Sequence, residues 1–286
     1  MDQVPYIFVD SVVGAFDQLP SPESISELTG SYWRNAFQEH DKKRMIFRLC
    51  LRYTNSGIMH VFKKLDWSGF PRTTLGFRKV LSLDQRFVRI HEIDLCSNRD
   101  NVFDGSADSV EIVSESEFSC LLLKYAFARL QPFDNGLDLI DINFEEQIIA
   151  AIPKWIYFST LSLKYCGKKG EDFLLNQIDN SSHLKTVSLS GEWRNQTILR
   201  KLVNLANRTK KQLVRLLLAR SELTMDEKLF EDLVNNWIGL YNPLHISVPT
   251  TLTETDIAEI MPRDKHGGNF FLLCPPNSKR DITAFL

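Results

Sequence analysis

Basic side chains gather around one apolar stretch of the chain, and they are the residues best suited to binding chemistry. The stretch is LVRLLLARSEL, Leu213 to Leu223, and the basic residues in and before it are Arg208, Lys210, Lys211, Arg215 and Arg220. Clustered arginines are well matched to phosphate and carboxylate groups. We therefore expect Arg215 and Arg220 to bind an acidic or phosphorylated segment of a target protein. The alternative is a solvated helix end, where Lys and Arg are common.

Sequence motifs for catalysis or cofactor binding are absent. CGKKGED (Cys166 to Asp172) lacks the Ser or Thr of a phosphate-binding loop and favours a turn before a helix. HGGNF (His266 to Phe270) is similar to the oxyanion loop of esterases, but the chain has no G-x-S-x-G motif. The histidines have no zinc-binding spacing, and Glu145-Glu146 and Asp226-Glu227 suit helix N-termini. We expect a non-enzymatic protein with no catalytic, cofactor-binding or metal-binding residue.

The composition is that of an ordinary globular chain. Its 34 basic and 36 acidic residues give a net charge of -2, which favours neither nucleic acid nor an anionic membrane as partner. The first residues lack the basic start of a signal peptide, and no apolar run approaches the roughly 20 residues that span a bilayer. The 5 cysteines include no CxxC pair and are predicted to be reduced, buried side chains. We expect a cytoplasmic or nuclear protein.

A triplet of apolar residues with the spacing L-x-x-L-x-L recurs along the second half of the chain. Its copies begin at Leu137, Phe158, Leu184, Leu213 and Tyr241, with weaker copies at Ile90 and around Phe271. The intervals between the main copies match the period of about 20 to 29 residues of leucine-rich repeats. Amphipathic helical patterns such as NQTILRKLVNLANR separate the triplets. We therefore predict an α/β fold in which residues 86–286 form a strand-helix solenoid.

A layered α/β enzyme is the alternative fold for the same pattern. Strand-helix-strand modules also run to about 30 residues, and such an enzyme would build its site from dispersed residues. The glycine-rich ligand loops expected after the strands of a doubly wound enzyme are missing. The sequence therefore favours the repeat interpretation.

The N-terminal residues 4–43 are predicted to form three short helices. The first covers Tyr6 to Phe16, the second Glu23 to Leu28, and the third begins near Ser31 and carries Trp33 and Phe37. The prolines of LPSPES separate the first two helices. A unit this small buries little surface, so it usually docks on a neighbour or a partner.

Several of these residues together resemble a known family. They are Val4, Pro5, Phe8, Val9, Asp10, Val12, Val13 and Trp33, and RFVRIHEI (Arg86 to Ile93) echoes a later part of the same family. The pattern resembles nematode F-box-like proteins with degenerate leucine-rich repeats. The resemblance implies that the N-terminal helices bind the adaptor subunit of a cullin-RING ubiquitin ligase, and that the repeats capture a target for ubiquitination. The candidate adaptor contacts are Val4, Pro5, Phe8, Val9 and Val12.

One departure from the F-box pattern keeps a second interpretation open. An ordinary F-box has Leu-Pro near its beginning, whereas Leu19-Pro20 lies in the middle of this segment. A leucine-rich-repeat scaffold without the ligase link is therefore the alternative function.

The segment between these parts is predicted to be a β-hairpin followed by a connector. RMIFRLCLRYTNSGIMHVFKKLDW alternates apolar and polar residues on both sides of Asn55-Ser56-Gly57. Residues Cys96 to Glu117 are polar and net acidic, which predicts a loop. The expected organisation is an F-box-like unit over 1–43, a hairpin and connector over 44–85, and a degenerate leucine-rich-repeat domain over 86–286.

Overall fold

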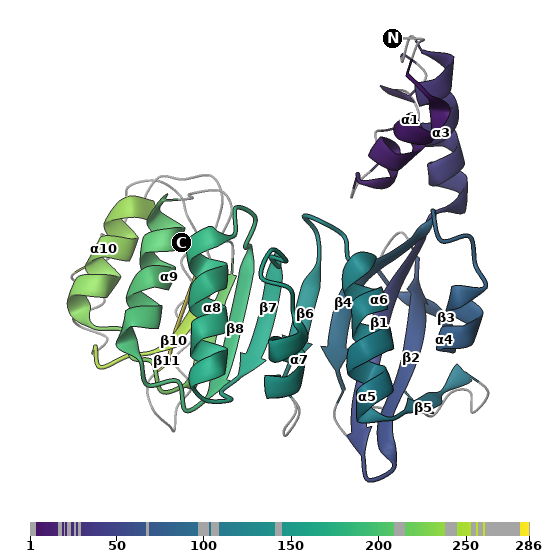
Figure 1. Ribbon diagram of the computed structural model, residues 1–286. Helices are drawn as coiled ribbons and strands as arrows, with labels where there is room; N and C mark the ends of the chain where they lie inside the picture. Colours follow the sequence, from purple (N-terminus) through teal and green to yellow (C-terminus); the bar gives the residue numbers. More distant parts are fainter. Residues whose placement is uncertain are drawn as a thin grey trace. The chain divides into compact units, whose positions relative to one another are not determined.

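The protein is a mixed α/β protein with a mostly parallel β-sheet (Figure 1). The computed structural model describes residues 4–16, 19, 21, 24–25, 27, 30–66, 69–96, 103, 109–140, 145–208, 215–237, 245–252, 256, 260 and 281–285. The chain divides into two compact units. The first comprises Met1–Asp138 and Ala151–Ile156, and the second comprises Leu139–Ala150 and Tyr157–Leu286.

The first unit begins with a helical hairpin. Helices α1 (Tyr6–Gly14) and α3 (Ser31–Lys43) confirm the first and third predicted helices. Of the second predicted helix, only Ser24 and Ile25 are described as helical, and Glu23 and Leu28 lie outside the described residues. The two long helices pack through one apolar cluster, formed by Val9, Val13, Ile25, Ala36 and Phe37.

The rest of the first unit is a sheet built around the predicted hairpin. Strands β1 (Met45–Thr54) and β2 (Gly57–Leu65) pair antiparallel around Asn55-Ser56, which confirms the hairpin. Strands β3 (Pro71–Leu75) and β5 (Glu111–Val113) add antiparallel to β2. On the other side β4 (Val88–Leu95) pairs parallel with β1, and β6 (Gly136–Leu139) pairs parallel with β4.

One face of this sheet carries the aromatic core of the unit. Phe62 of β2 packs on Phe77 of α4 (Phe77–Leu81) with ring centroids 5.8 Å apart. Phe77 contacts Tyr125 of α6 (Leu123–Ala128) at 5.2 Å. Helix α6 continues a short helix α5 (Glu115–Glu117) and a π-helical turn η3 (Phe118–Leu122), and Ser114 caps this series through the backbone and side chain of Glu117. Arg48, Cys50 and Arg52 alternate with the apolar residues of β1 and therefore project from the opposite face.

The second unit alternates strands and helices. After α7 (Glu145–Ala151), a helix most of whose residues belong to this unit, the order is β7 (Thr160–Lys164), α8 (Lys168–Asn180), β8 (Thr186–Gly191), α9 (Gln196–Arg208), β9 (Arg215–Ser221), α10 (Glu227–Trp237), β10 (His245–Pro249) and β11 (Asp281–Phe285). Strands β7 to β10 are parallel neighbours in sequence order, and β11 pairs antiparallel with β10. Helices α8, α9 and α10 lie side by side over one face of these strands (Figure 1).

The apolar triplets locate three strands of this unit in register. Leu161, Val187 and Leu216, the second residues of their copies, occupy equivalent positions in β7 to β9 and are buried. In β10 the equivalent buried residue is Ile246, the third residue of its copy, so that copy is offset by two residues. Two predicted turn and cap features are also confirmed. Gly167, with a φ of 85°, precedes α8, and the Asp226 Oδ1 accepts a hydrogen bond from the Leu229 backbone N–H at the start of α10. None of the helices in the described residues is long and apolar enough to cross a membrane.

The solenoid prediction is wrong. A solenoid needs one strand per unit, each paired only with the strands of the preceding and following units. Here β4, the first predicted repeat strand, pairs with β1 of the hairpin. The sheet also contains β2, β3, β5 and β11, each of which pairs antiparallel with a neighbouring strand. The hairpin, the connector and β4 lie in the same compact unit, and β1 pairs with β4.

The acidic loop is shorter than predicted. Strand β5 and helix α5 lie within the Cys96 to Glu117 segment. Cys96 and Phe103 are buried, and residues 97–102 and 104–108 lie outside the described residues. The weak triplet copy around Phe271 and the HGGNF stretch also lie outside the described residues.

His60 of β2 is a fully buried ionisable group in the aromatic core. Its ring contacts Phe62 and Phe77 at 6.5 and 6.1 Å between centroids. The Nε2 lies 3.6 Å from Oε2 of Glu111 on β5, and within the described residues neither ring nitrogen has a hydrogen-bond partner. Burial lowers the pKa of His60, against the opposing effect of the Glu111 carboxylate. The folded protein therefore favours the neutral imidazole.

We expect the free energy of unfolding to fall as the pH is lowered from 7 to 5. The unfolded chain protonates His60 near pH 6.5, about its ordinary pKa, whereas the folded chain does so only at lower pH. The stabilisation that comes from neutral His60 is fully present above about pH 6.5. It is lost as the pH falls from there to the lower pKa of the folded chain, at up to about 1.4 kcal/mol per pH unit. Urea melts at pH 7, 6 and 5 measure this dependence.

The variant His60→Phe tests whether His60 causes the decrease. It keeps a ring against Phe62 and Phe77 but cannot titrate, so its stability is expected to fall less steeply. His40 and His245, whose pKa values burial also lowers, contribute to the decrease that remains. The same slope in the variant and the wild type would contradict this explanation.

Candidate protein-interaction surfaces

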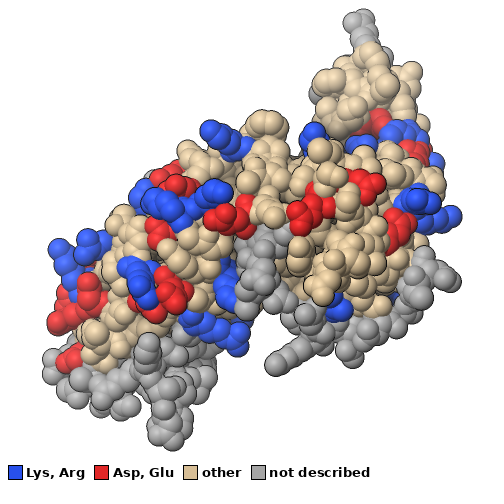
Figure 2. Space-filling view, turned by 60° about the horizontal axis from the view of Figure 1, so that its bottom comes forward, with Lys and Arg blue, Asp and Glu red and all other residues tan. Residues whose placement is uncertain are grey.

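One side of α1 is apolar and exposed. Ile7, Phe8, Ser11, Val12 and Ala15 share it, because spacings of three and four residues place them on one face of a helix. Ile7 is 75% exposed and Phe8 is 55% exposed. We call this set the α1 face. On the view in Figure 2 the helical hairpin presents mostly uncharged side chains.

The opposite side of α1 is fixed to α3 and to the sheet of the first unit. Val9 and Val13 are fully buried against α3. Arg89 of β4 donates hydrogen bonds from Nε and Nη2 to the Gly14 carbonyl, at 2.9 and 2.6 Å. Arg44 donates from Nη2 to the Val13 carbonyl at 3.0 Å. These bonds satisfy carbonyl groups at the C-terminus of α1, where a helix has none of its own donors left.

A polar network also joins α1 to α3. The His40 Nε2 lies 3.0 Å from the Asp10 Oδ1, and both residues are buried. Burial lowers the pKa of His40, although Asp10 opposes this effect. The Tyr6 hydroxyl donates to Glu39 Oε2 at 2.7 Å, and burial together with this bond raises the pKa of Tyr6 to about 12. The network orients α1 on α3 and holds the α1 face outward.

A second surface lies on the strands of the second unit. The side chains that alternate with the buried residues of β7 to β10 are half-buried or exposed, and they face away from α8, α9 and α10. They form two rows in register: Thr160, Thr186, Arg215 and His245, then Ser162, Ser188, Leu217 and Ser247. We call these eight residues the strand face. It is rich in hydroxyl groups and carries one exposed guanidinium.

The two candidate target-binding arginines lie at opposite ends of β9. Arg215 is exposed, as expected, and pairs with Thr186 and His245. Arg220 is also exposed but pairs with Ser190. Five residues of a strand span about 16 Å, so the two arginines do not form one anion-binding cluster. The side chains of Arg208, Lys210 and Lys211 lie outside the described residues.

The candidate adaptor contacts divide into two groups. Phe8 is exposed and Val12 is half-buried, and both belong to the α1 face. Pro5 is exposed at the N-terminus of α1, and half-buried Val4 packs against the cluster between α1 and α3. Val9 instead lies in the core between α1 and α3. Ile7, the most exposed large apolar residue of α1, is not among the contacts predicted from the sequence. No sequence signal distinguishes it, because α1 is apolar on both sides.

The chain was compared with protein-family models, with curated proteins and with solved structures, and no match was found. The resemblance to nematode F-box-like proteins therefore stays a prediction. The assignment of the two surfaces therefore depends only on the geometry of this chain.

Proposed function

We propose that this protein is a non-enzymatic substrate receptor of a cullin-RING ubiquitin ligase. The helical hairpin binds the adaptor subunit through the α1 face, and the second unit binds the target through the strand face. In this arrangement α1 is the F-box-like element, and Ile7, Phe8 and Val12 supply the apolar contact.

The exposure of the α1 face is the observation that carries the proposal. Helix α1 is apolar on nearly all sides, and such a helix is usually buried. Only the side with Val9 and Val13 is covered by α3. A contiguous exposed apolar surface on a folded protein marks a site of association, because leaving it in water costs free energy. We assign the adaptor subunit as the partner that covers this surface.

The target surface is supported by its chemistry. Hydroxyl groups and a guanidinium donate hydrogen bonds, so the strand face suits the carboxylate or phosphate groups of an acidic segment. The parallel strands keep these donors at fixed spacing of about 4.8 Å across the sheet. An extended peptide that crosses the strands can therefore contact the successive residues Thr186, Arg215 and His245.

A pull-down with purified adaptor subunit tests the ligase assignment. We expect the wild-type chain to retain the adaptor and the triple variant Val4→Ala, Pro5→Ala, Phe8→Ala to lose it. Circular dichroism and thermal melting show whether that variant is folded. Failure of the folded wild-type chain to retain any adaptor would exclude the ligase link and leave a scaffold.

Charge reversal on the strand face is expected to weaken target binding. Arg215→Glu places a carboxylate between Thr186 and His245, and we expect it to lower the affinity for a glutamate-rich peptide at least about tenfold. Arg220→Glu makes the same change at the other end of β9 and serves as the matched control. Fluorescence anisotropy of the labelled peptide measures both. Equal losses in the two variants would mean that net charge, and not the strand face, governs binding.

A further inference from the structure

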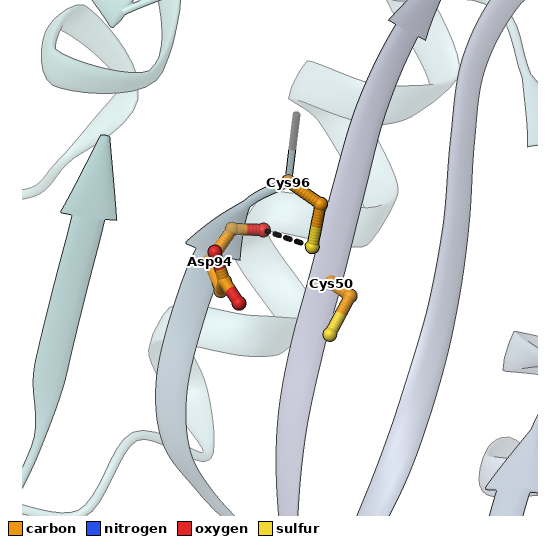
Figure 3. Close-up of side chains that lie close together, drawn as sticks. All are labelled: Cys50, Asp94 and Cys96. Carbon is orange, nitrogen blue, oxygen red and sulfur yellow. Dashed lines mark hydrogen bonds between the residues drawn. The ribbon is translucent and has the colours of Figure 1, made fainter. Parts of the chain in front are cut away.

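Two thiols and a carboxyl group meet on the second face of the sheet in the first unit (Figure 3). Cys50 of β1 is the direct neighbour of Asp94 on β4, and Cys96 follows β4 immediately. Residues two apart on a strand share a face, so the three side chains project to the same side. Their three donor atoms, one from each side chain, all lie within 4.8 Å of one another.

Apolar residues shield the two thiols from solvent, and Asp94 is half-buried. Cys50 is 1% exposed and Cys96 is 3% exposed, and they pack with Val61 and Phe103 in one cluster. The Arg52 guanidinium lies over the Phe103 ring, 4.4 Å from its centroid. A positive charge therefore stands close to the cluster, where it can offset negative charge on the thiols and the carboxylate.

The geometry does not suit a disulfide between Cys50 and Cys96. Their backbone positions are one strand apart and offset by two residues, which corresponds to a Cα separation of about 8 Å. A disulfide requires about 4.4 to 6.8 Å. A metal ion spans a wider gap, because metal-sulfur bonds of about 2.3 Å in a tetrahedron place two sulfur atoms about 3.8 Å apart. Such a spacing is compatible with the 4.8 Å within which the three donor atoms lie.

We propose that Cys50, Cys96 and Asp94 bind a zinc ion, with water in the fourth position. Zinc accepts thiolate and carboxylate ligands together, whereas softer ions such as Cu(I) select sulfur and disfavour a carboxylate. The ion replaces two thiol protons, and the complex with two thiolates and one carboxylate carries a net charge of about −1, which Arg52 opposes.

The contacts of the site fix its shape without a metal. The Cys96 thiol donates to the Asp94 backbone carbonyl at a sulfur-oxygen distance of 3.9 Å, which directs its sulfur along the β1 side of β4. The bound ion would connect the middle of β1 to the end of β4.

Cobalt is a spectroscopic probe for this site. We expect Co²⁺ added to the reduced full chain to give a thiolate-to-cobalt absorption band in the near ultraviolet, and Zn²⁺ to abolish the band by displacement. Cys50→Ala and Cys96→Ala are expected to weaken or lose it. Cys120→Ala, in which the removed thiol is exposed on η3, is the matched control and is expected to keep it.

Two further measurements keep the test independent of how the cysteine variants fold. Zinc at about one hundred times its dissociation constant is expected to raise the melting temperature of the wild-type chain by roughly 5 to 10 °C. Asp94→Asn retains both thiols and is expected to keep the band while weakening cobalt affinity at least about tenfold. Absence of the band from the wild type, its full retention in both Cys50→Ala and Cys96→Ala, or its loss from Cys120→Ala would overturn the assignment.

Discussion

Acidic residues placed on the α1 face are expected to abolish adaptor binding and to leave the fold intact. The variant Ile7→Asp, Phe8→Asp changes the two most exposed large side chains of α1. Apolar anchors at the centre of an interface each contribute about 2 kcal/mol or more, so the double variant should weaken binding roughly 1000-fold. Both side chains point away from the core cluster, so the melting temperature should change little. Isothermal titration calorimetry measures the affinity.

The core residue Val9 provides the contrasting control. It is one residue from Phe8 but fully buried, so Val9→Ala is expected to destabilise the helical hairpin by about 2 kcal/mol through the cavity it leaves. At a temperature where this variant remains folded, its adaptor affinity should stay close to that of the wild type. If Val9→Ala loses the adaptor while the double variant keeps it, the contact surface has been assigned to the wrong side of α1.

The largest effect on stability is expected from Trp193→Ala. Trp193 is fully buried between β8 and α9, and its ring lies 5.4 Å from that of Tyr165 between centroids. Its Nε1–H donates to the Ser190 carbonyl at 2.9 Å. Removing a buried tryptophan side chain costs about 3 to 5 kcal/mol, a large share of the roughly 5 to 15 kcal/mol that stabilises a domain. Urea unfolding followed by circular dichroism measures this loss.

Trp155→Ala is the matched control for that measurement. It removes the same side chain, but Trp155 is 78% exposed, so the free energy of unfolding should change by less than about 0.5 kcal/mol. Comparable losses in the two variants would show that Trp193 does not hold the second unit together as its burial indicates.

The strands and helices could be predicted from the sequence because their patterns are local. Buried residues such as Leu161 and Leu163 are two apart in β7, and the triplet records that alternation. The overall arrangement could not be predicted in the same way. Pairing of β1 with β4 joins segments that are separated by β2, β3 and α4, and no periodicity within either strand specifies its partner.

The candidate sites show the same limit. Helix α1 is apolar on both sides, so its sequence cannot distinguish Val9, which is buried, from Ile7, which is exposed. The proximity of Cys50 and Cys96 depends on the register of β1 against β4 and leaves no spacing motif in the sequence. Exposure of Arg215 could be predicted, because it precedes the buried Leu216 in a strand whose side chains alternate.

Hydrogen-deuterium exchange of the chain with and without adaptor tests the central claim most directly. The proposal predicts a stable complex in which amide exchange slows in α1, over Tyr6–Gly14, and stays unchanged on the strands of the second unit. A complex that protects residues outside the helical hairpin while α1 exchanges as in the free chain would contradict the assignment of the α1 face. The absence of any complex would contradict the function proposed for the protein.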